Sequence, residues 1–179
     1  MNCKRRYSIF AALFFSATLV AGFSGCEVKE NSVVIDYRSQ LKLDSKPGNA
    51  AKIGDAQTSV ADTKAQVTIV GKADLQALPA GDKPKAVMLV REIIADSHGH
   101  GSDHDASSCA FCRHRQKQAP KAAVEFVGTD GKVLPYTVGT LFGLQNGDEV
   151  VVTGTATMDA NAEMLKVTAH GLYFKNSSH

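Results

Sequence analysis

Residues 147–155 read GDEVVVTGT, and this stretch says most about the fold. Three consecutive valines between a Gly-Asp turn and a Thr-Gly-Thr end are typical of a buried strand, because β-branched side chains pack well on a pleated sheet. The segment before it, 138–144, is rich in apolar residues and predicts one or two helical turns. The segment after it predicts a turn at 158–163 and a last strand at 164–174.

The sequence upstream of this stretch predicts further strands. Apolar and polar residues alternate near 66–71, and a continuous apolar run occupies 86–94. The segment between them is rich in proline and glycine and predicts a loop. Residues 122–127 and 132–137 flank the sequence GTDG, and Asp-Gly between two apolar runs predicts a β-hairpin.

A short helix followed by the pattern x-G-D-x-V-x-V-x-G resembles the approach to the fourth strand of OB-fold domains, and residues 165–169 resemble their closing strand. The resemblance covers about residues 66–174 and is one of pattern. It implies an all-β fold, a small five-stranded Greek-key barrel with one short helix, whose ligands use one face and the 1-2 and 4-5 loops. In the matching register, residues 66–94 form one interrupted first strand. A β-sandwich of similar strand count is the alternative.

The N-terminus carries a targeting signal. Lys4, Arg5 and Arg6 precede an apolar run from 9 to 23 that is short for a membrane span, which is the pattern of a signal peptide. The run ends in FSGC at 23–26, which resembles the lipobox of bacterial lipoproteins. The alternative is an ordinary secretory signal in which the cysteine has no role.

The lipobox resemblance implies that residues 1–25 are removed and that Cys26 is lipidated, so the membrane is the first expected partner. Glu27 stands where the family's inner-membrane retention signal is an aspartate, which implies an outer-membrane protein facing the periplasm. Residues 26–64 hold few apolar clusters and predict a largely disordered tether. The barrel domain is expected at 65–175.

Processing changes the charge balance. The chain has 20 Lys and Arg against 18 Asp and Glu, and the signal takes three basic residues and no acidic one with it. The mature chain therefore carries 17 basic and 18 acidic residues, a net charge of −1, and has no basic stripe. Nucleic acid is not an expected partner, because its binding requires clustered positive charge. An envelope protein remains a candidate partner.

The densest chemistry lies in the loop 95–120, where positions 98–114 read HGHGSDHDASSCAFCRH. Glycine, serine and aspartate make this stretch polar, and a long loop in a compact domain is usually functional or disordered. Imidazole and thiolate are well suited to binding Zn(II) and copper. The candidate metal ligands are His98, His100, His104, Cys109, Cys112 and His114. We expect Zn(II) first and copper second, no organic cofactor, and a position in the 1-2 loop of the barrel.

The cysteines have two other interpretations. Once Cys3 leaves with the signal and Cys26 carries lipid, Cys109 and Cys112 are the only thiols of the mature chain. An oxidising compartment favours a structural disulfide between them, in which case the protein is an interaction or scaffold module. A thiol-redox role is the third alternative. The thioredoxin type of C-x-x-C lies at a helix N-terminus after a strand, a context that the sequence does not predict here.

Haem and enzyme chemistry are disfavoured. The C-x-x-C-H motif of haem attachment is interrupted by Arg113 before His114. Residues 170–173 read HGLY, one residue short of the His-x-x-x-Tyr of the membrane-tethered OB-fold haem chaperones of cytochrome c maturation. The sequence has no G-x-S-x-G, H-E-x-x-H or P-loop pattern. We therefore expect a binding protein without catalytic residues rather than an enzyme.

Overall fold

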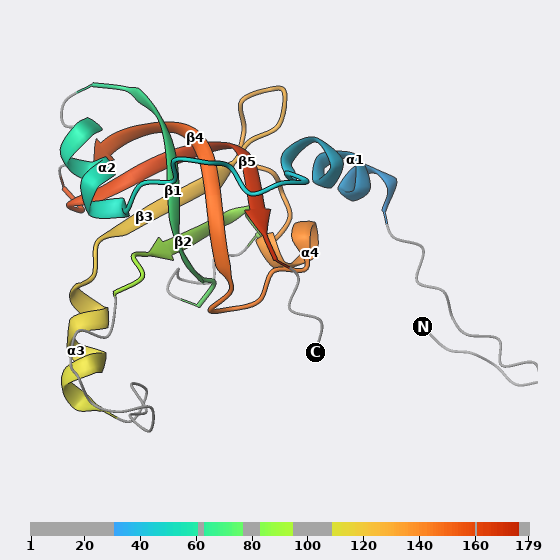
Figure 1. Cartoon of the computed structure of the whole chain (residues 1–179). Helices are drawn as coiled ribbons and strands as arrows, with labels where there is room; N and C mark the ends of the chain where they lie inside the picture. The colour runs from blue at the N-terminus through green and yellow to red at the C-terminus, as the bar shows by residue number, and fades with distance from the viewer. Residues whose placement is uncertain (1–30, 61–62, 77–82, 95–108, 160, 176–179) are drawn as a thin grey trace, which may run out of the picture.

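The computed structural model describes residues 31–60, 63–76, 83–94, 109–159 and 161–175 (Figure 1). The predicted signal peptide and its lipidation site lie outside these ranges, as do three of the four candidate histidines of the loop.

Five strands and four helices make up the described chain. The strands are β1 (Ala65–Asp74), β2 (Val87–Arg91), β3 (Lys121–Phe126), β4 (Glu149–Asp159) and β5 (Met164–Phe174). The helices are α1 (Ser32–Leu41), α2 (Ile53–Val60), α3 (Ala110–Gln118) and α4 (Val138–Phe142). The prediction of a mostly β fold with a short helix before the fourth strand is confirmed.

The five strands form one mixed sheet. β1 pairs antiparallel with β2 and β4, β2 pairs antiparallel with β3, and β4 with β5, whereas β3 and β5 run parallel. The order β1-β2-β3-β5-β4 closes on itself as a barrel, because each strand has a neighbour on both sides. Figure 1 shows the strands wrapped around a common interior. A single closed sheet differs from the two packed sheets of the alternative β-sandwich.

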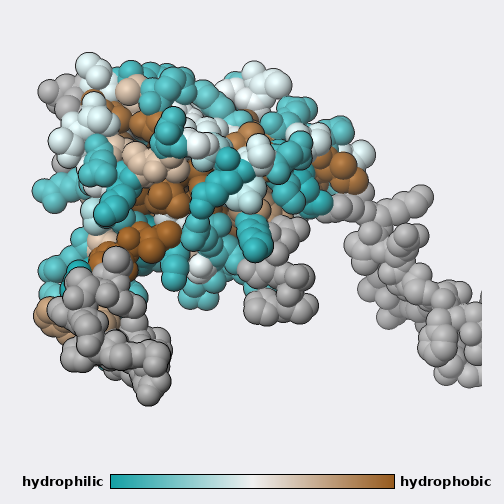
Figure 2. Space-filling view, viewed as in Figure 1, coloured by the Kyte–Doolittle hydropathy of each residue, from teal (hydrophilic) through white to brown (hydrophobic). Residues whose placement is uncertain are grey.

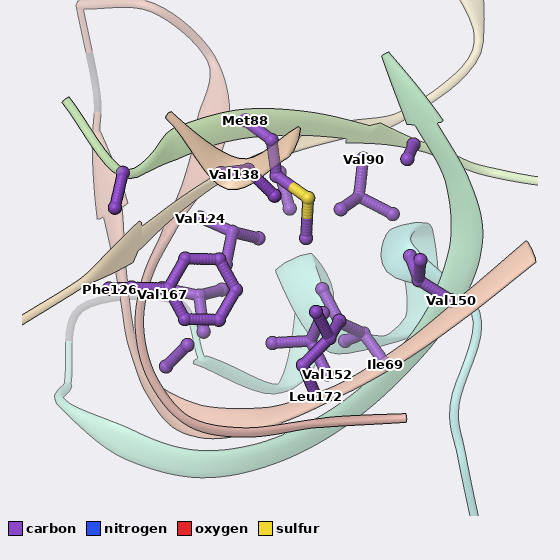
Figure 3. Close-up of a cluster of buried hydrophobic side chains, with 14 of the residues drawn as sticks. Ile69, Met88, Val90, Val124, Phe126, Val138, Val150, Val152, Val167 and Leu172 are labelled. Atoms are coloured by element: carbon purple, nitrogen blue, oxygen red, sulfur yellow. The ribbon is translucent and has the colours of Figure 1, made fainter. Parts of the chain in front are cut away.

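Alternate residues of the strands fill the interior. Burial alternates strictly along β3, where Val124 and Phe126 are fully buried. Figure 3 shows these two side chains and Met88 pointing inward, with Val152 and Leu172 on the opposite wall. Burial of each such side chain contributes about 1.5–3 kcal/mol to the transfer free energy that favours folding. The core therefore comes from residues scattered over the whole barrel.

The short helix α4 packs its apolar side against this core. The rings of Phe142 and Phe126 lie 4.9 Å apart between centroids. The hydroxyl of Thr137 accepts a hydrogen bond from the Thr140 N–H and so caps the helix at its start. Gly143, with φ at 72°, ends it in the left-handed conformation that favours glycine. The capping residues at both ends of α4 and its packing on the core therefore favour the same short helix.

The glycine within GDEVVVTGT has a packing reason. At Gly154, β4 and β5 change register and approach closely. A Cβ at this position would clash with the carbonyl oxygen of Thr168 and would lie 2.9 Å from a methyl carbon of Val167. Only glycine fits such an approach without movement of the neighbouring strand.

The prediction that 26–64 is a largely disordered tether is wrong for the residues that the structure describes. α1 buries Val34 and Leu41, and α2 buries Ile53, Ala56 and Val60. The α2 residues follow the i, i+3, i+7 spacing of one helix face, so a short segment buries enough apolar surface to order itself on the barrel. In the part of the chain covered by the structure, no helix is long and apolar enough to span a bilayer.

Two details of the predicted register are also wrong. Residues 66–94 are not one strand, because β1 and β2 are separate and antiparallel, with Lys72 opposite Arg91. The His/Cys stretch therefore lies between β2 and β3, not in the 1-2 loop. Residues 132–137 form no strand. The predicted Asp-Gly turn is nevertheless present. Val127 and Val133 form an isolated antiparallel bridge, and the Leu134 N–H donates to the Phe126 carbonyl oxygen over 3.0 Å. The pairing stops at Pro135, which cannot donate a ladder hydrogen bond.

Candidate functional site

The C-x-x-C sequence forms the first turn of α3. Cys109 is the N-cap residue, with extended φ and ψ of −77° and 118°. The backbone N–H of Cys112 donates a hydrogen bond to the Cys109 Sγ over 3.5 Å, and the Arg113 N–H donates to the Cys109 carbonyl oxygen over 3.0 Å. Cys109 and Cys112 are not joined to each other by a disulfide. The expectation of a loop throughout 95–120 is therefore wrong from residue 110 to 118.

The composition of α3 explains why a helix forms here. The sequence AFCRHRQKQ consists mostly of good helix formers, with basic Arg115 and Lys117 in the last turn, where they complement the helix dipole. Pro120 disfavours helical conformation in the residue before it, and the helix ends at Gln118. These signals are visible in the sequence, but the many glycines and serines before Cys109 concealed them.

The two cysteines differ in exposure. Cys112 is 8% exposed, whereas Cys109 is only half-buried. In the N-cap and third helical positions, the two side chains belong to the same turn, and the hydrogen bond from Cys112 holds the Cys109 sulfur beside the Cys112 backbone. The pair thus presents one partly exposed and one buried cysteine at the start of a helix.

The helix start stabilises the thiolate form of Cys109. Hydrogen bonding from the Cys112 backbone N–H is the main reason that the pKa of the Cys109 thiol is lowered from its usual value, followed by a hydrogen bond with the Cys112 side chain. The nearby Arg113 guanidinium lowers the pKa further, and partial burial opposes these effects. Negative charge is favoured at a helix N-terminus for the same physical reason.

The structure does not bring His114 together with the cysteine pair. Two residues correspond to about 200° of rotation around a helix, so His114 projects to the side opposite Cys112. His114 is exposed while Cys112 is buried. Within the ranges that the structure covers, no three His, Cys, Asp or Glu side chains cluster as a metal site would require. His98, His100 and His104 are outside those ranges.

A cavity of about 330 Å³ lies beside α3, at the ends of β1 and β2. Its lining includes Gln116, which lies one helical turn after Cys112 and therefore on the same side of α3. Across the cavity, the Arg91 guanidinium pairs with the Asp74 carboxylate. No sequence pattern predicts this cavity, because its lining combines residues of separate segments.

The surface around α3 is partly apolar. Phe111, between the two cysteines, is 58% exposed, and Ile93 at the end of β2 is 37% exposed. Figure 2 shows apolar surface where α3 meets the barrel, surrounded by hydrophilic side chains. Figure 1 shows α3 projecting from the end of the barrel opposite α1. The cysteine pair is therefore carried on a protruding element.

No protein-family model matches the chain, and no curated protein matches it either.

Proposed function

We propose that this protein binds a metal ion, Zn(II) first and copper second, through the sulfur atoms of Cys109 and Cys112. The observation that carries the proposal is the arrangement of both cysteines in the first turn of α3, with an N–H group donating to one sulfur. Thiolates are preferred ligands of these metals, and hydrogen bonds to a ligand atom orient and tune it. A lowered pKa of Cys109 favours the thiolate that binds metal.

Histidines that precede α3 would complete a tetrahedral site. His98, His100 and His104 come 5 to 11 residues before Cys109 in the chain. Two of them with the two cysteines would give a Cys₂His₂ set, which is a common ligand set of structural zinc. His114 would contribute only if α3 unwound, because it lies on the far side of the helix. We therefore assign the nitrogen ligands to the preceding histidines.

We further propose that the domain is an OB-fold. The closed strand order β1-β2-β3-β5-β4, the parallel pairing of β3 with β5, and the helix α4 between β3 and β4 support this assignment. The proposed metal site would then lie in the 2-3 connection of the barrel. The domain serves as a rigid support that carries the site on α3.

We also propose that the protein is a lipoprotein of the outer membrane, facing the periplasm. The FSGC sequence at 23–26 and the preceding apolar run support this location. An expressed full-length chain should incorporate labelled palmitate and sediment with membranes. Cys26→Ser should abolish both properties, whereas Cys109→Ser should leave them unchanged. Membrane association of the Cys26→Ser variant would overturn the assignment of the anchor.

The metal proposal is tested on reduced protein that begins at residue 27, so that no lipid or third cysteine is present. Titration with Zn(II) followed by desalting and elemental analysis should give one metal per chain. Cys109→Ser and Cys112→Ser should each remove most of it, and His98→Ala, His100→Ala and His104→Ala in combination should weaken it. His114→Ala and His170→Ala are matched controls that should retain the metal. A stoichiometry near zero in the parent protein would refute the proposal.

A further inference from the structure

We propose that the cysteine pair of α3 also exchanges with disulfides of other molecules, with Cys109 as the attacking thiol and Cys112 as the resolving thiol. This activity goes beyond metal binding and requires the metal-free, reduced protein. It is carried by the position, exposure and mutual proximity of the two sulfur atoms. The sequence argued against such a role because no helix following a strand was expected at the motif, and α3 supplies the helix.

Access distinguishes the two thiols. Thiol–disulfide exchange requires a sulfur atom to reach the sulfur of an incoming disulfide. Cys109 is half-buried and precedes the first helical residue, whereas Cys112 lies within the helix and is only 8% exposed. An incoming disulfide therefore meets Cys109 first, and Cys112 is shielded from bulky reagents.

Proximity allows the pair to close. The Cys109 Sγ lies 3.5 Å from the Cys112 backbone nitrogen. Residues three apart on a helix have Cβ atoms about 5–6 Å apart, whereas a disulfide joins Cβ atoms about 3.5–4.5 Å apart. Cys109 precedes the first helical residue, so a change in its backbone and rotamer can bring the two sulfurs into bonding distance, and α3 holds Cys112 next to any mixed disulfide formed at Cys109.

The exchange is balanced in two steps. The Cys109 thiolate attacks one sulfur of the partner's disulfide, a bond from Cys109 to that sulfur forms, and the partner's other sulfur leaves and takes a proton from solvent. Cys112 then loses its proton to solvent and attacks the Cys109 sulfur, so that the mixed disulfide breaks and the partner's second thiolate leaves. Two electrons pass from the cysteine pair to the partner, which becomes a dithiol.

The surface of α3 indicates the class of partner. Phe111 is 58% exposed between the cysteines, and its neighbours in the helix are basic rather than acidic, with Arg113 directly after Cys112. A protein disulfide flanked by apolar and acidic side chains would complement this surface. Glutathione disulfide carries carboxylates and is small, and it is a suitable probe for the chemistry.

The test follows the adducts of reduced, metal-free protein from residue 27 after addition of glutathione disulfide, by intact mass. The parent protein should lose two hydrogens and carry no lasting adduct. Cys112→Ser should accumulate one glutathione, and Cys109→Ser should form its adduct at least tenfold more slowly. Equal adduct rates in the two variants would overturn the assigned roles. A parent protein that stays reduced while Cys112→Ser forms no adduct would overturn the exchange itself.

Two further measurements keep the result interpretable. Cys112→Ala, which leaves no hydroxyl in the buried position, should behave like Cys112→Ser, and circular dichroism should show that both variants are folded. Metal stoichiometry is measured separately on the reduced protein. Loss of metal binding with intact exchange would refute the metal proposal alone, and metal binding without exchange would refute only the inference made here.

Discussion

At the scale of single residues, Cys109 combines two functions that different residues usually perform. It caps α3, a position normally held by Ser, Thr, Asp or Asn, and it offers a thiol to solvent. Because the hydrogen bond from the Cys112 N–H serves both purposes, capping the helix and stabilising the thiolate are the same interaction. The cysteine spacing could be read from the sequence, but the capping role could not, since it depends on where the helix begins.

This coupling predicts a pH dependence. The pKa of the Cys109 thiol is lowered in the folded protein, so its alkylation by iodoacetamide should reach half its maximal rate at a lower pH than in protein unfolded by urea. The same shift contributes stability above the unfolded-state pKa, and this contribution is lost as the pH falls through the folded-state value. The rate is followed by peptide mass. Identical pH profiles in folded and unfolded protein would contradict the account.

Capping and ligation can be separated by two substitutions at one position. Cys109→Ser and Cys109→Ala should both lose the metal, but only alanine removes the cap. Loss of an N-cap costs about 0.5–2 kcal/mol of helix stability. Amide hydrogen exchange at 111–113 should therefore accelerate in Cys109→Ala and change little in Cys109→Ser. Equal exchange in the two variants would show that the cap does not stabilise α3.

At the scale of elements, the sequence predicted those helices and strands that have strong local signals. GDEVVVTGT begins β4, the next apolar run is β5, and α4 precedes them as expected. α2 was missed because eight residues with few apolar positions form a helix only when packed on the barrel. The apolar residues of 132–137 predicted a strand beside β3. In the structure β2 and β5 already pair with the two edges of β3, so 132–137 adds no further strand.

The close approach of β4 and β5 can be tested at one glycine. Gly154→Ala places a methyl group against the Thr168 carbonyl, and overpacking of this kind costs about 1–3 kcal/mol of unfolding free energy. Gly48→Ala is the matched control, because its added Cβ would meet nothing within 4 Å. Urea unfolding measures both. A Gly154→Ala variant as stable as the control would contradict the described register.

At the scale of the whole molecule, the helices lie at two ends of one barrel. α1 and α3 are on opposite sides of it in Figure 1. α1 is joined to the domain by its buried Val34 and Leu41, and the Arg38 Nε donates to the Leu141 carbonyl oxygen of α4 over 2.5 Å. The proposed anchor at Cys26 precedes the first residue of α1 by six positions, so α1 is the described element nearest to it in the chain.

The structural role of α1 predicts a clear effect of truncation. A protein that begins at residue 43 loses two buried aliphatic side chains, each worth about 1.5–3 kcal/mol of burial. Its unfolding free energy should therefore fall by about 3–6 kcal/mol relative to a protein that begins at residue 27. A protein that begins at residue 31 is the control and should match the longer one. Equal stability of all three would mean that α1 does not stabilise the barrel.

The most direct test of the central claim is X-ray absorption at the zinc edge of the reduced, zinc-loaded protein that begins at residue 27. The account predicts two sulfur ligands at about 2.3 Å and two nitrogen ligands at about 2.0–2.1 Å. Cys109→Ser and Cys112→Ser should each bind little zinc after the same loading, so their zinc-edge signal should fall, whereas His170→Ala should give an unchanged spectrum. A zinc ion surrounded only by nitrogen and oxygen atoms would contradict the claim that the first turn of α3 binds the metal.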